Sequence, residues 1–345
     1  MSNNPAAAVA LREAIPINLR RSLALSFPFR WTDRRTYRLP ASDGPLGAYY
    51  IGWRSDTSAW GEDWSVSPFD SNGVLLTLRG NAYHPIRIAQ FALQAHAKWI
   101  QMRAERSLRA FIAQADWLRD NQQRCGAVDG CYAFGFPWLR YGARAGWISA
   151  MAQGEAISVL LRADEMVSRA GYLEAAMRAA MPFRRDVKNG GVVSRTSMGD
   201  LFFEEVAVEK PPHILNGHIF ALWGLWELHR LTQEEWLRTL VTEAVKTLCR
   251  RLPLYDSGYW SYYNLLSYDG FRPVATLKYH AFHIAQLRVL AAMCNERSFG
   301  VVADRWEAYQ KDHVSRLRTL ANTLGALGRR AAHRDRIENA CNVLA

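Results

Sequence analysis

Apolar residues recur at helical spacing along most of the chain after residue 84. Ile86, Ala89 and Leu93 mark one face of a first helix, and Pro85 suits its start because the amide hydrogen that proline lacks would be unpaired there. The same spacing predicts further helices over residues 108–121, 147–162, 168–180, 216–231, 233–252, 276–294 and 302–324. The pattern therefore indicates a mainly α protein.

These helices alternate between two surface patterns. The segment 216–231 is apolar on nearly every side, whereas 233–252 carries a charged stripe, as in "TQEEWLRTLVTEAVKTLCRRL". Helices that are apolar all round are buried, and striped helices face solvent. The alternation predicts an α/α barrel, or toroid, of paired inner and outer helices. No strict sequence repeat occurs, which argues against a solenoid of fixed period.

Residues 1–80 differ in composition from the rest. The stretches "YRLPASDGPLGAYYIGW" and "SVSPFDSNGVLLTLRG" are rich in Gly, Pro, Ser and Asp, with short apolar runs, which predicts extended structure with a hairpin or two. We therefore expect an N-terminal extended segment with short strands over 1–80, the toroid over 81–325, and a basic tail over 326–345.

Three segments between the predicted helices hold most of the aromatic and acidic residues that helical periodicity does not explain. They cover residues 122–144, 186–214 and 254–276, and the first is too rich in glycine and aromatic residues for a regular helix. Long loops in a compact domain are commonly functional. We expect these three loops to line a cleft at one end of the inner ring.

Composition narrows the class of partner. The 345 residues carry a formal net charge of +11, which favours an anionic partner such as nucleic acid, a lipid surface or an acidic polysaccharide. No RNA-binding, zinc-finger or basic-zipper signature occurs, which argues against nucleic acid. The 13 Trp and 14 Tyr would suit platforms for sugar rings. Composition therefore leaves a lipid surface and an acidic polysaccharide as the favoured anionic partners.

Cysteine usage and hydropathy bear on the compartment. The five cysteines are odd in number and irregularly spaced, which argues against a disulfide framework and favours a reducing compartment. The first 22 residues lack the uninterrupted apolar run of a secretory signal, and no 18-residue apolar run could span a membrane. The expectation is a cytoplasmic protein without a transmembrane segment.

The stretch "ATLKYHAFHIAQL" at residues 275–287 combines core-like spacing with polar groups. Leu277, Ile284 and Leu287 recur as on a buried helical face, whereas Tyr279 and His283 lie four residues apart on a neighbouring face. Two interpretations are open: the polar groups are satisfied inside a tight core, or they line a cavity where chemistry occurs. The second interpretation places Tyr279 and His283 in the cavity.

Four motifs resemble the C-terminal catalytic domain of the D-glucuronyl C5-epimerase family. They are "GWISAMAQG" at Gly146–Gly154, "EEVAVEKPPHILNG" at Glu204–Gly217, "LPLYDSG" at Leu252–Gly258 and "YHAFHIAQL" at Tyr279–Leu287. The weaker "YHPIRIAQFAL" and "ADWLRDNQQ" also look like family segments, but the β-rich domain that separates them in the animal enzymes is missing. The resemblance covers roughly residues 83–310, with the motifs in family order.

The resemblance implies an epimerase that removes the C5 proton of a uronic acid in a heparosan-like polysaccharide and returns one from the opposite face. Such a reaction needs an acid or base on each side of the sugar ring and donors that stabilise charge on the C6 carboxylate. By position, Glu205, Tyr279 and Tyr263 match the family's catalytic glutamate and tyrosines. As substrate-binding residues we expect Glu204, Arg144, Trp147, Gln153, Asn216, His280 and His283.

Further expectations concern the site and the assembly. No metal or organic cofactor is required, and the His280–x–x–His283 spacing lacks the third ligand of a metal site. Burial and the neighbouring Glu204 should raise the pKa of Glu205, and His280 or His283 could assist a tyrosine. A homodimer is a further option for the assembly.

The chain departs from the family at two positions. The family has a catalytic tyrosine directly after its glutamate pair, where this chain has Val206. It also has an arginine that helps hold the uronate carboxylate, where this chain has Leu266. The candidates to replace the lost cation are Arg140, Arg144, Arg272 and Lys278.

Structural interpretations stand beside the functional ones. Trp147 and Gln153 either floor the cleft or simply pack, and Asn216–Gly217 resembles a helix N-cap with a close-packing glycine. Asp256–Gly258 resembles a turn whose aspartate accepts backbone amides.

Two other functions stay open. One is a glycoside hydrolase or lyase on the same toroid, with Glu204 or Glu205 as general acid or base. For inverting hydrolysis, the carboxyl pair to measure is Glu205 with Asp256 or Asp269. The other is a glycan-binding protein that has lost its chemistry along with the family tyrosine and arginine.

Overall fold

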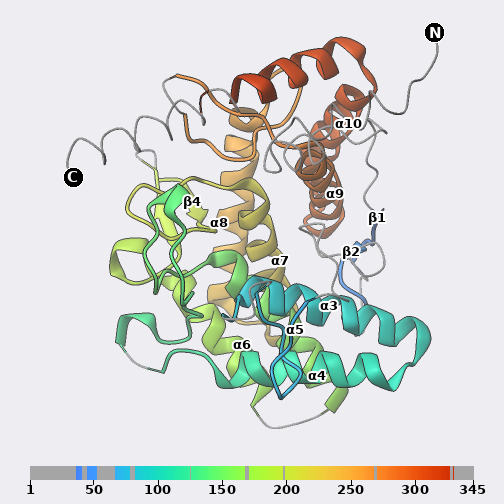
Figure 1. The fold of residues 1–345 in the computed structure, drawn as a ribbon, viewed down its shortest axis with the longest axis vertical. Helices are drawn as coiled ribbons and strands as arrows, with labels where there is room; N and C mark the ends of the chain where they lie inside the picture. The colour runs from blue at the N-terminus through green and yellow to red at the C-terminus, as the bar shows by residue number, and fades with distance from the viewer. Residues whose placement is uncertain are drawn as a thin grey trace, which may run out of the picture.

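In the computed structural model, the described residues are 36–40, 45–52, 67–77, 82–124, 126–167, 171–196, 199–267, 270–326 and 329. Most of them are helical, which confirms the predicted fold class (Figure 1). Parts of the expected N-terminal segment over 1–80, and nearly all of the expected tail over 326–345, lie outside the described residues.

Helices that follow one another in the chain pack as antiparallel pairs. The pairs are α3 (Pro85–Met102) with α4 (Glu105–Asp120), α5 (Ala150–Val167) with α6 (Tyr172–Ala180), α7 (Leu215–Thr232) with α8 (Glu235–Arg251), and α9 (Leu277–Met293) with α10 (Arg297–Lys311). The first helix of each pair contacts the first helix of the next, from α3 through α5 and α7 to α9 (Figure 1). This is the inner and outer arrangement that the alternating patterns predicted.

Burial separates the two kinds of helix. Every residue from Ala150 to Ala163 of α5 is buried. The outer helix α8 instead buries a single stripe, made of Leu237, Val241, Ala244, Thr247 and Leu248. An all-round apolar helix can be buried on every side only as part of an inner layer, so the sequence pattern itself selects this arrangement.

The inner helices α5 and α7 cross at two glycines. A Cβ atom added to Gly154 would overlap the Cα of Ala221 and lie 2.8 Å from the carbonyl oxygen of Phe220. A Cβ added to Gly224 would overlap the backbone of Gly154. The small residues of "AMAQGEA" therefore allow the two backbones to touch, which is a packing role.

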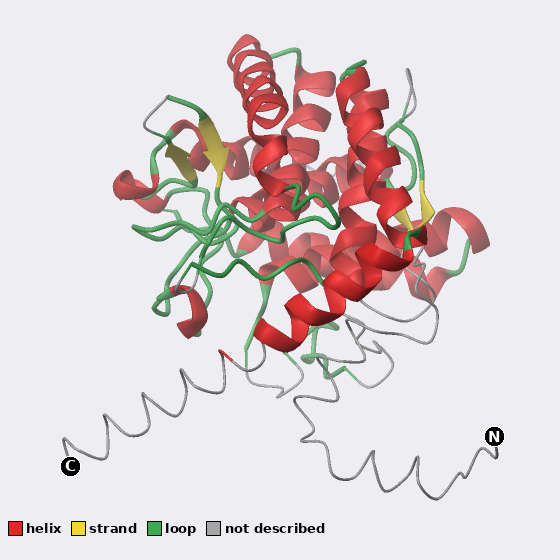
Figure 2. Ribbon diagram, turned by 90° about the horizontal axis from the view of Figure 1, so that it is seen from above, coloured by secondary structure: helices red, strands yellow, loops and turns green. Residues whose placement is uncertain are grey.

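Two short antiparallel strand pairs flank the helices. β1 (Thr36–Tyr37) pairs with β2 (Ile51–Gly52), and β1 contacts α9. β3 (Val193–Arg195) pairs with β4 (Leu201–Phe203), with Val193 opposite Phe203. In the view from above, the β3–β4 hairpin and several long loops lie to one side of the helices (Figure 2).

Some boundaries differ from those predicted. The helix expected over 302–324 is broken at Asp312, whose side-chain oxygen accepts a hydrogen bond from the amide of Ser315 at 2.7 Å and so begins a new helix over 313–326. α6 begins at Tyr172, directly after Gly171, which has a φ of 107°. The loop expected over 186–214 contains the β3–β4 hairpin, whose three-residue strands are too short to show a period of two.

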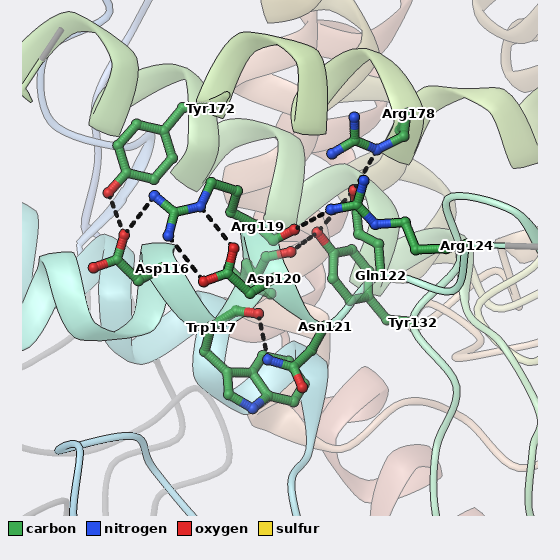
Figure 3. A network of polar contacts seen from close by, with 11 residues as sticks. Asp116, Trp117, Arg119, Asp120, Asn121, Gln122, Arg124, Tyr132, Tyr172 and Arg178 are labelled. Atoms are coloured by element: carbon green, nitrogen blue, oxygen red, sulfur yellow. Dashed lines mark hydrogen bonds and ion pairs between the residues drawn. The ribbon is translucent and has the colours of Figure 1, made fainter. Parts of the chain in front are cut away.

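Short 3₁₀ turns occupy the first of the three predicted loops, at Gly126–Val128 and Leu139–Tyr141. Its start is anchored to α4 and α6 by a polar network (Figure 3). Gln122 donates to the carbonyl oxygen of Ala175 at 2.7 Å, and Arg178 donates to the amide oxygen of Gln122 at 3.1 Å. The hydroxyl of Tyr132 donates to the carbonyl oxygen of Leu118 at 2.7 Å. The loop therefore leaves α4 in a fixed direction.

Two expectations about the whole chain can be compared with the described residues. Cys131, Cys249 and Cys294 are free thiols. Across the described part of the chain, no helix combines the length and the apolar character needed to cross a bilayer.

The glycine contact between α5 and α7 can be tested with matched substitutions. Gly154→Ala should lower the free energy of unfolding by about 1–3 kcal/mol, because the added methyl group overlaps backbone atoms that cannot move independently. Gly300→Ala, inside α10, is the control. A Cβ added to Gly300 would meet only the Cβ of Ala291, at 4.0 Å. There the change should be neutral or slightly stabilising. Equal urea midpoints for the two variants would contradict the close crossing.

Candidate active site

Glu204 and Glu205 follow directly after β4 and are held by the backbone on both sides. The amide of Glu204 donates to the carbonyl oxygen of Val192 at 2.8 Å, and its carbonyl oxygen accepts from the amide of Ala150 at 2.9 Å. The pair is thereby fixed between the β3–β4 hairpin and the first residue of α5.

Glu204 supports the neighbouring loop. Its wholly buried carboxylate accepts hydrogen bonds from the hydroxyl of Ser194 and from the amide of His213 at 3.2 Å, and its Oε1 lies 2.6 Å from the Nδ1 of His213. His213 has a φ of 50°, which is unusual for a residue with a side chain. Tyr255 also donates to the His213 carbonyl at 2.8 Å. Glu204 therefore has a structural role: its carboxylate stabilises the turn at His213.

Glu205 points to the other side of the chain and is also wholly buried. Its side chain lies against Gly217 in the first turn of α7, where an added Cβ would be 2.9 Å from the Cγ of Glu205. Among the described residues, its Oε2 has no hydrogen-bond partner. Burial raises the pKa of Glu205 to about 8, a hydrogen bond from Tyr263 opposes that shift, and the charge of Glu204 adds to it.

Two tyrosines complete the cluster. The hydroxyl of Tyr263 lies 3.5 Å from the Oε1 of Glu205, and the ring centroids of Tyr263 and Tyr279 are 4.6 Å apart. The loop that carries Tyr263 is tied to α7, because the carbonyl oxygen of Tyr263 accepts from the amide of Leu215 at 3.1 Å. Burial and then the charge of Glu205 raise the pKa of both phenols well above the usual range. Glu205, Tyr263 and Tyr279 thus lie together, although they are far apart in the sequence.

A third tyrosine, Tyr141, belongs to the same cluster. Its side chain is only 8% exposed, and its hydroxyl oxygen accepts a hydrogen bond from the Nδ2 of Asn264 at 3.4 Å. The charge that Tyr141 would carry as a phenolate raises the pKa of Tyr263 and Tyr279, whereas the Arg140 guanidinium lowers both. Sequence reasoning missed Tyr141 because it lies in an irregular loop and outside the family motifs.

The comparisons with known proteins agree with the sequence motifs. The family described as "D-glucuronyl C5-epimerase C-terminus" matches residues 130–308, which is more than half of the chain. The chain belongs to this family. It is 33% identical over 224 residues to "D-glucuronyl C5-epimerase" of Caenorhabditis elegans, a match that covers 61% of this chain and 36% of that protein.

A second relative is an uncharacterized protein of Methanocaldococcus jannaschii. It is 32% identical over 140 residues, which are 40% of this chain and 45% of that protein. The chain therefore spans less than half the length of the relatives that it matches.

Solved structures resemble the chain at low identity. One is an unsaturated glucuronyl hydrolase from Bacillus sp. GL1, with a TM-score of 0.41 and 15% identity over 68% of this chain and 62% of that chain. Another is a variant of Rex8A from Paenibacillus barcinonensis, with a TM-score of 0.42 and 13% identity over 88% of this chain and 72% of that chain.

The two histidines of the family motif on α9 face the outer helix α10. The Oγ of Ser261 lies 2.8 Å from the Nδ1 of His280 and 2.9 Å from the Nδ1 of His283. The Nε2 of His280 lies 2.9 Å from the carbonyl oxygen of Trp306, which comes from α10. Burial lowers the pKa of His280 to about 3 and that of His283 well below its usual value. Both are therefore neutral and cannot provide the cation that a tyrosine would need.

Packing and cleft roles were both open for Gln153 and Trp147. In the structure, Gln153 is hydrogen-bonded to the backbone and Trp147 packs on an aromatic ring. The side chain of Gln153 accepts from the amide of Tyr132 at 2.9 Å and donates to the carbonyl oxygens of Gly130 and Ala179, each at 2.8 Å. The ring of Trp147 stacks on that of Phe134 with their centroids 3.7 Å apart, and Trp147 is 6% exposed. Contact of either residue with substrate stays a prediction.

Asn216 is buried in the first turn of α7 but does not cap it, because the N-cap residue is Ile214. The prediction of an N-cap at Asn216 was therefore wrong, and that of a close-packing Gly217 is confirmed by its contact with Glu205. Arg144 is exposed in the loop that leads to Trp147. A role in substrate binding stays a prediction for Asn216 and Arg144.

The hydrolase alternative depended on a second carboxylate. One oxygen of Asp256 accepts from the Nε1 of Trp306 at 3.1 Å, and the other accepts from the amide of Gly258 at 2.8 Å and the hydroxyl of Tyr309 at 3.2 Å. These bonds confirm the predicted turn and occupy the carboxylate. The other candidate, Asp269, lies outside the described residues.

Neither position at which the chain departs from the family offers a polar side-chain group. Val206 is wholly buried in the core, and Leu266 packs against the same core. Among the described residues, no group of three or more His, Cys, Asp and Glu side chains is arranged to hold a metal ion.

The raised pKa of Glu205 predicts a pH dependence of stability. The ordinary value of 4.5 applies in the unfolded chain, whereas the folded value is about 8, so the folded state holds one more proton between these pH values. That stabilisation is complete below pH 4.5 and is lost as the pH rises through about 8. Relative to Glu205→Gln, the wild type should therefore lose stability, on the order of a few kcal/mol, between pH 5 and pH 9.

Urea unfolding at several pH values measures this difference. The exposed Glu174 of α6 provides the control, because Glu174→Gln should leave the wild-type pH profile unchanged. Parallel profiles for the wild type and Glu205→Gln would show that Glu205 is ionised in the folded protein.

Proposed function

We propose that the protein epimerises C5 of uronic acid residues, glucuronate to iduronate, in an acidic polysaccharide of the heparosan type. One observation carries the proposal: a wholly buried carboxyl group with a pKa of about 8 lies 3.5 Å from one tyrosine hydroxyl, and a second tyrosine packs on the first. The membership of the family supports it, as does the net charge of +11, which suits a polyanionic substrate.

The reaction transfers one proton off C5 and one proton onto it. The ionised carboxylate of Glu205 takes the C5 proton, and the electron pair of the C–H bond moves into the C5–C6 bond as negative charge develops on the C6 carboxylate. The hydroxyl of Tyr279 then gives its proton to the opposite face of C5, which inverts the centre. Glu205 ends as a carboxylic acid and Tyr279 as a phenolate, and proton exchange with water restores both.

The electrostatics of the cluster suit these roles. A carboxylate whose pKa is about 8 is a stronger base than one in water, and general bases work best when their pKa lies near the working pH. The raised pKa of Tyr279 keeps its phenol protonated at neutral pH, so a proton is available for the carbanion. Tyr263 contacts both groups: its ring packs against that of Tyr279, and its hydroxyl donates to Glu205 at 3.5 Å, which positions the carboxylate.

Deuterium incorporation tests the proposal. Incubation with heparosan in deuterated water should introduce deuterium at C5 of the uronate without shortening the chain, as measured by NMR. Tyr279→Phe keeps the ring and removes only the oxygen, so it should lower the exchange rate by roughly two orders of magnitude or more with little change in melting temperature.

Tyr172→Phe is the matched control. Its hydroxyl donates to Asp116 at 2.7 Å between outer helices, so the substitution should cost about 1 kcal/mol of stability and leave exchange unchanged. Wild-type exchange by Tyr279→Phe would make Tyr279 a packing residue. Chain shortening by the wild type would instead favour a hydrolase or lyase.

A further inference from the structure

The turn that carries Arg140 and Tyr141 is a closed loop with a fixed orientation. Trp138 and Ala143 pair through two backbone hydrogen bonds, of 2.8 and 3.2 Å, around the 3₁₀ turn Leu139–Tyr141. Gly142 closes the turn with a φ of 67°, a conformation that favours glycine. The turn therefore presents its side chains in defined directions.

Aromatic packing sets which side chain of the turn points inward. The ring of Trp138 lies 4.9 Å from Tyr141 in an edge-on arrangement and 5.4 Å from Trp147. Trp147 is itself fixed by its Nε1, which donates to the carbonyl oxygen of Phe136 at 2.9 Å. Tyr141 is consequently buried, whereas the preceding Arg140 is exposed.

The phenol of Tyr141 joins the segment that carries Tyr263. Asn264 donates to the Tyr141 hydroxyl oxygen at 3.4 Å, and its own side-chain oxygen accepts from the amide of Leu266 at 3.1 Å. Because Asn264 directly follows Tyr263 in the chain, its hydrogen bond holds the Tyr141 hydroxyl close to the segment that carries Tyr263. The ring of Tyr263 in turn lies 4.6 Å from that of Tyr279, so the three tyrosines belong to one cluster.

Arg140 adds a positive charge at the exposed side of this cluster. Its guanidinium carbon lies 5.4 Å from the ring centroid of Tyr141, within the range of a cation–π contact. The positive charge of the same guanidinium lowers the pKa of Tyr263 and of Tyr279. It is therefore near the phenols and still open to solvent, where a polyanionic chain would approach.

The proposed reaction needs such a charge. Removal of the C5 proton places negative charge on the C6 carboxylate, and hydrogen-bond donors and cations aimed at that charge stabilise it. Val206 and Leu266 cannot provide donors, and His280 and His283 are neutral. In the 138–143 turn, Arg140 and Tyr141 are donors of this kind, and both act on the pKa of Tyr263 and Tyr279.

We infer that the Arg140–Tyr141 turn holds the uronate carboxylate: the Arg140 guanidinium pairs with it, and the Tyr141 hydroxyl donates a hydrogen bond to it. The inference rests on the proposed function, because it takes a uronate as the group bound beside Glu205. It adds that carboxylate recognition comes from a loop of the chain that precedes α5.

Calorimetric titration separates this inference from the proposed reaction. The ligands are a heparosan hexasaccharide and the same hexasaccharide with its carboxyl groups reduced to alcohols. Arg140→Ala should weaken binding of the first at least about tenfold, the scale of a lost charge-assisted hydrogen bond, and leave binding of the second unchanged. Arg140→Lys should recover part of the loss, and Arg109→Ala, an exposed arginine on α4, should bind as the wild type does.

Tyr141→Phe provides the second arm. It keeps the aromatic packing on Trp138, so the melting temperature should stay close to that of the wild type. Binding of the carboxylate hexasaccharide should weaken severalfold to about tenfold, and binding of the reduced one should not change.

Three outcomes would overturn the inference. They are unchanged binding of the carboxylate hexasaccharide by Arg140→Ala and Tyr141→Phe, an equal loss of affinity for both hexasaccharides, or no binding of the carboxylate form by the wild type. A wild type that binds the hexasaccharide but introduces no deuterium at C5 would overturn the proposed reaction instead, while the binding comparison still decides the role of the turn.

Discussion

The contact of α5 with α7 at Gly154 and Gly224 determines where the candidate site forms. Ala150, the first residue of α5, donates to the backbone of Glu204, and Gly217, in the first turn of α7, packs on the side chain of Glu205. The first turns of α5 and α7 therefore contact the glutamate pair, and the crossing of the two helices fixes these turns relative to each other. A larger residue at either glycine would separate the helices and open the space in which Glu205 is buried.

Two electrostatic effects act on the Glu205 carboxyl in opposite directions. The start of α7 carries partial positive charge, which favours the ionised form by about 0.3–1 kcal/mol. Complete burial disfavours a charge by several kcal/mol unless the charge is paired. Among the described residues, no cationic side chain forms an ion pair with Glu205. Desolvation therefore dominates, as the pKa of about 8 indicates. A site that contained a closely paired arginine at this position would hold a much weaker base.

The sequence allowed the helices to be predicted but not the partners of the buried polar groups. The apolar pattern located α7 and α8 to within two residues, because α7 is buried on nearly every side and α8 buries a regular stripe. The β3–β4 hairpin left no periodic signal. Glu205 and Tyr279 were identified from motifs of the family, since nothing in their spacing distinguishes them from core residues. The bonds of Gln153 to Gly130 and Ala179 depend on segments far away in the chain, which no local pattern encodes.

The two adjacent glutamates show how an extended chain can divide structural and chemical roles. Successive side chains of a strand point to opposite sides, so Glu204 reaches Ser194 and His213 while Glu205 reaches Tyr263. The next residue, Val206, returns to the core, and a polar side chain there would have to be buried among apolar neighbours. A phenol reaches Glu205 instead from the 254–276 loop, and the phenols of α9 and of the 138–143 turn join it in one cluster. Because these elements are separate, one can change its side chains without altering the helices that hold the carboxyl in place.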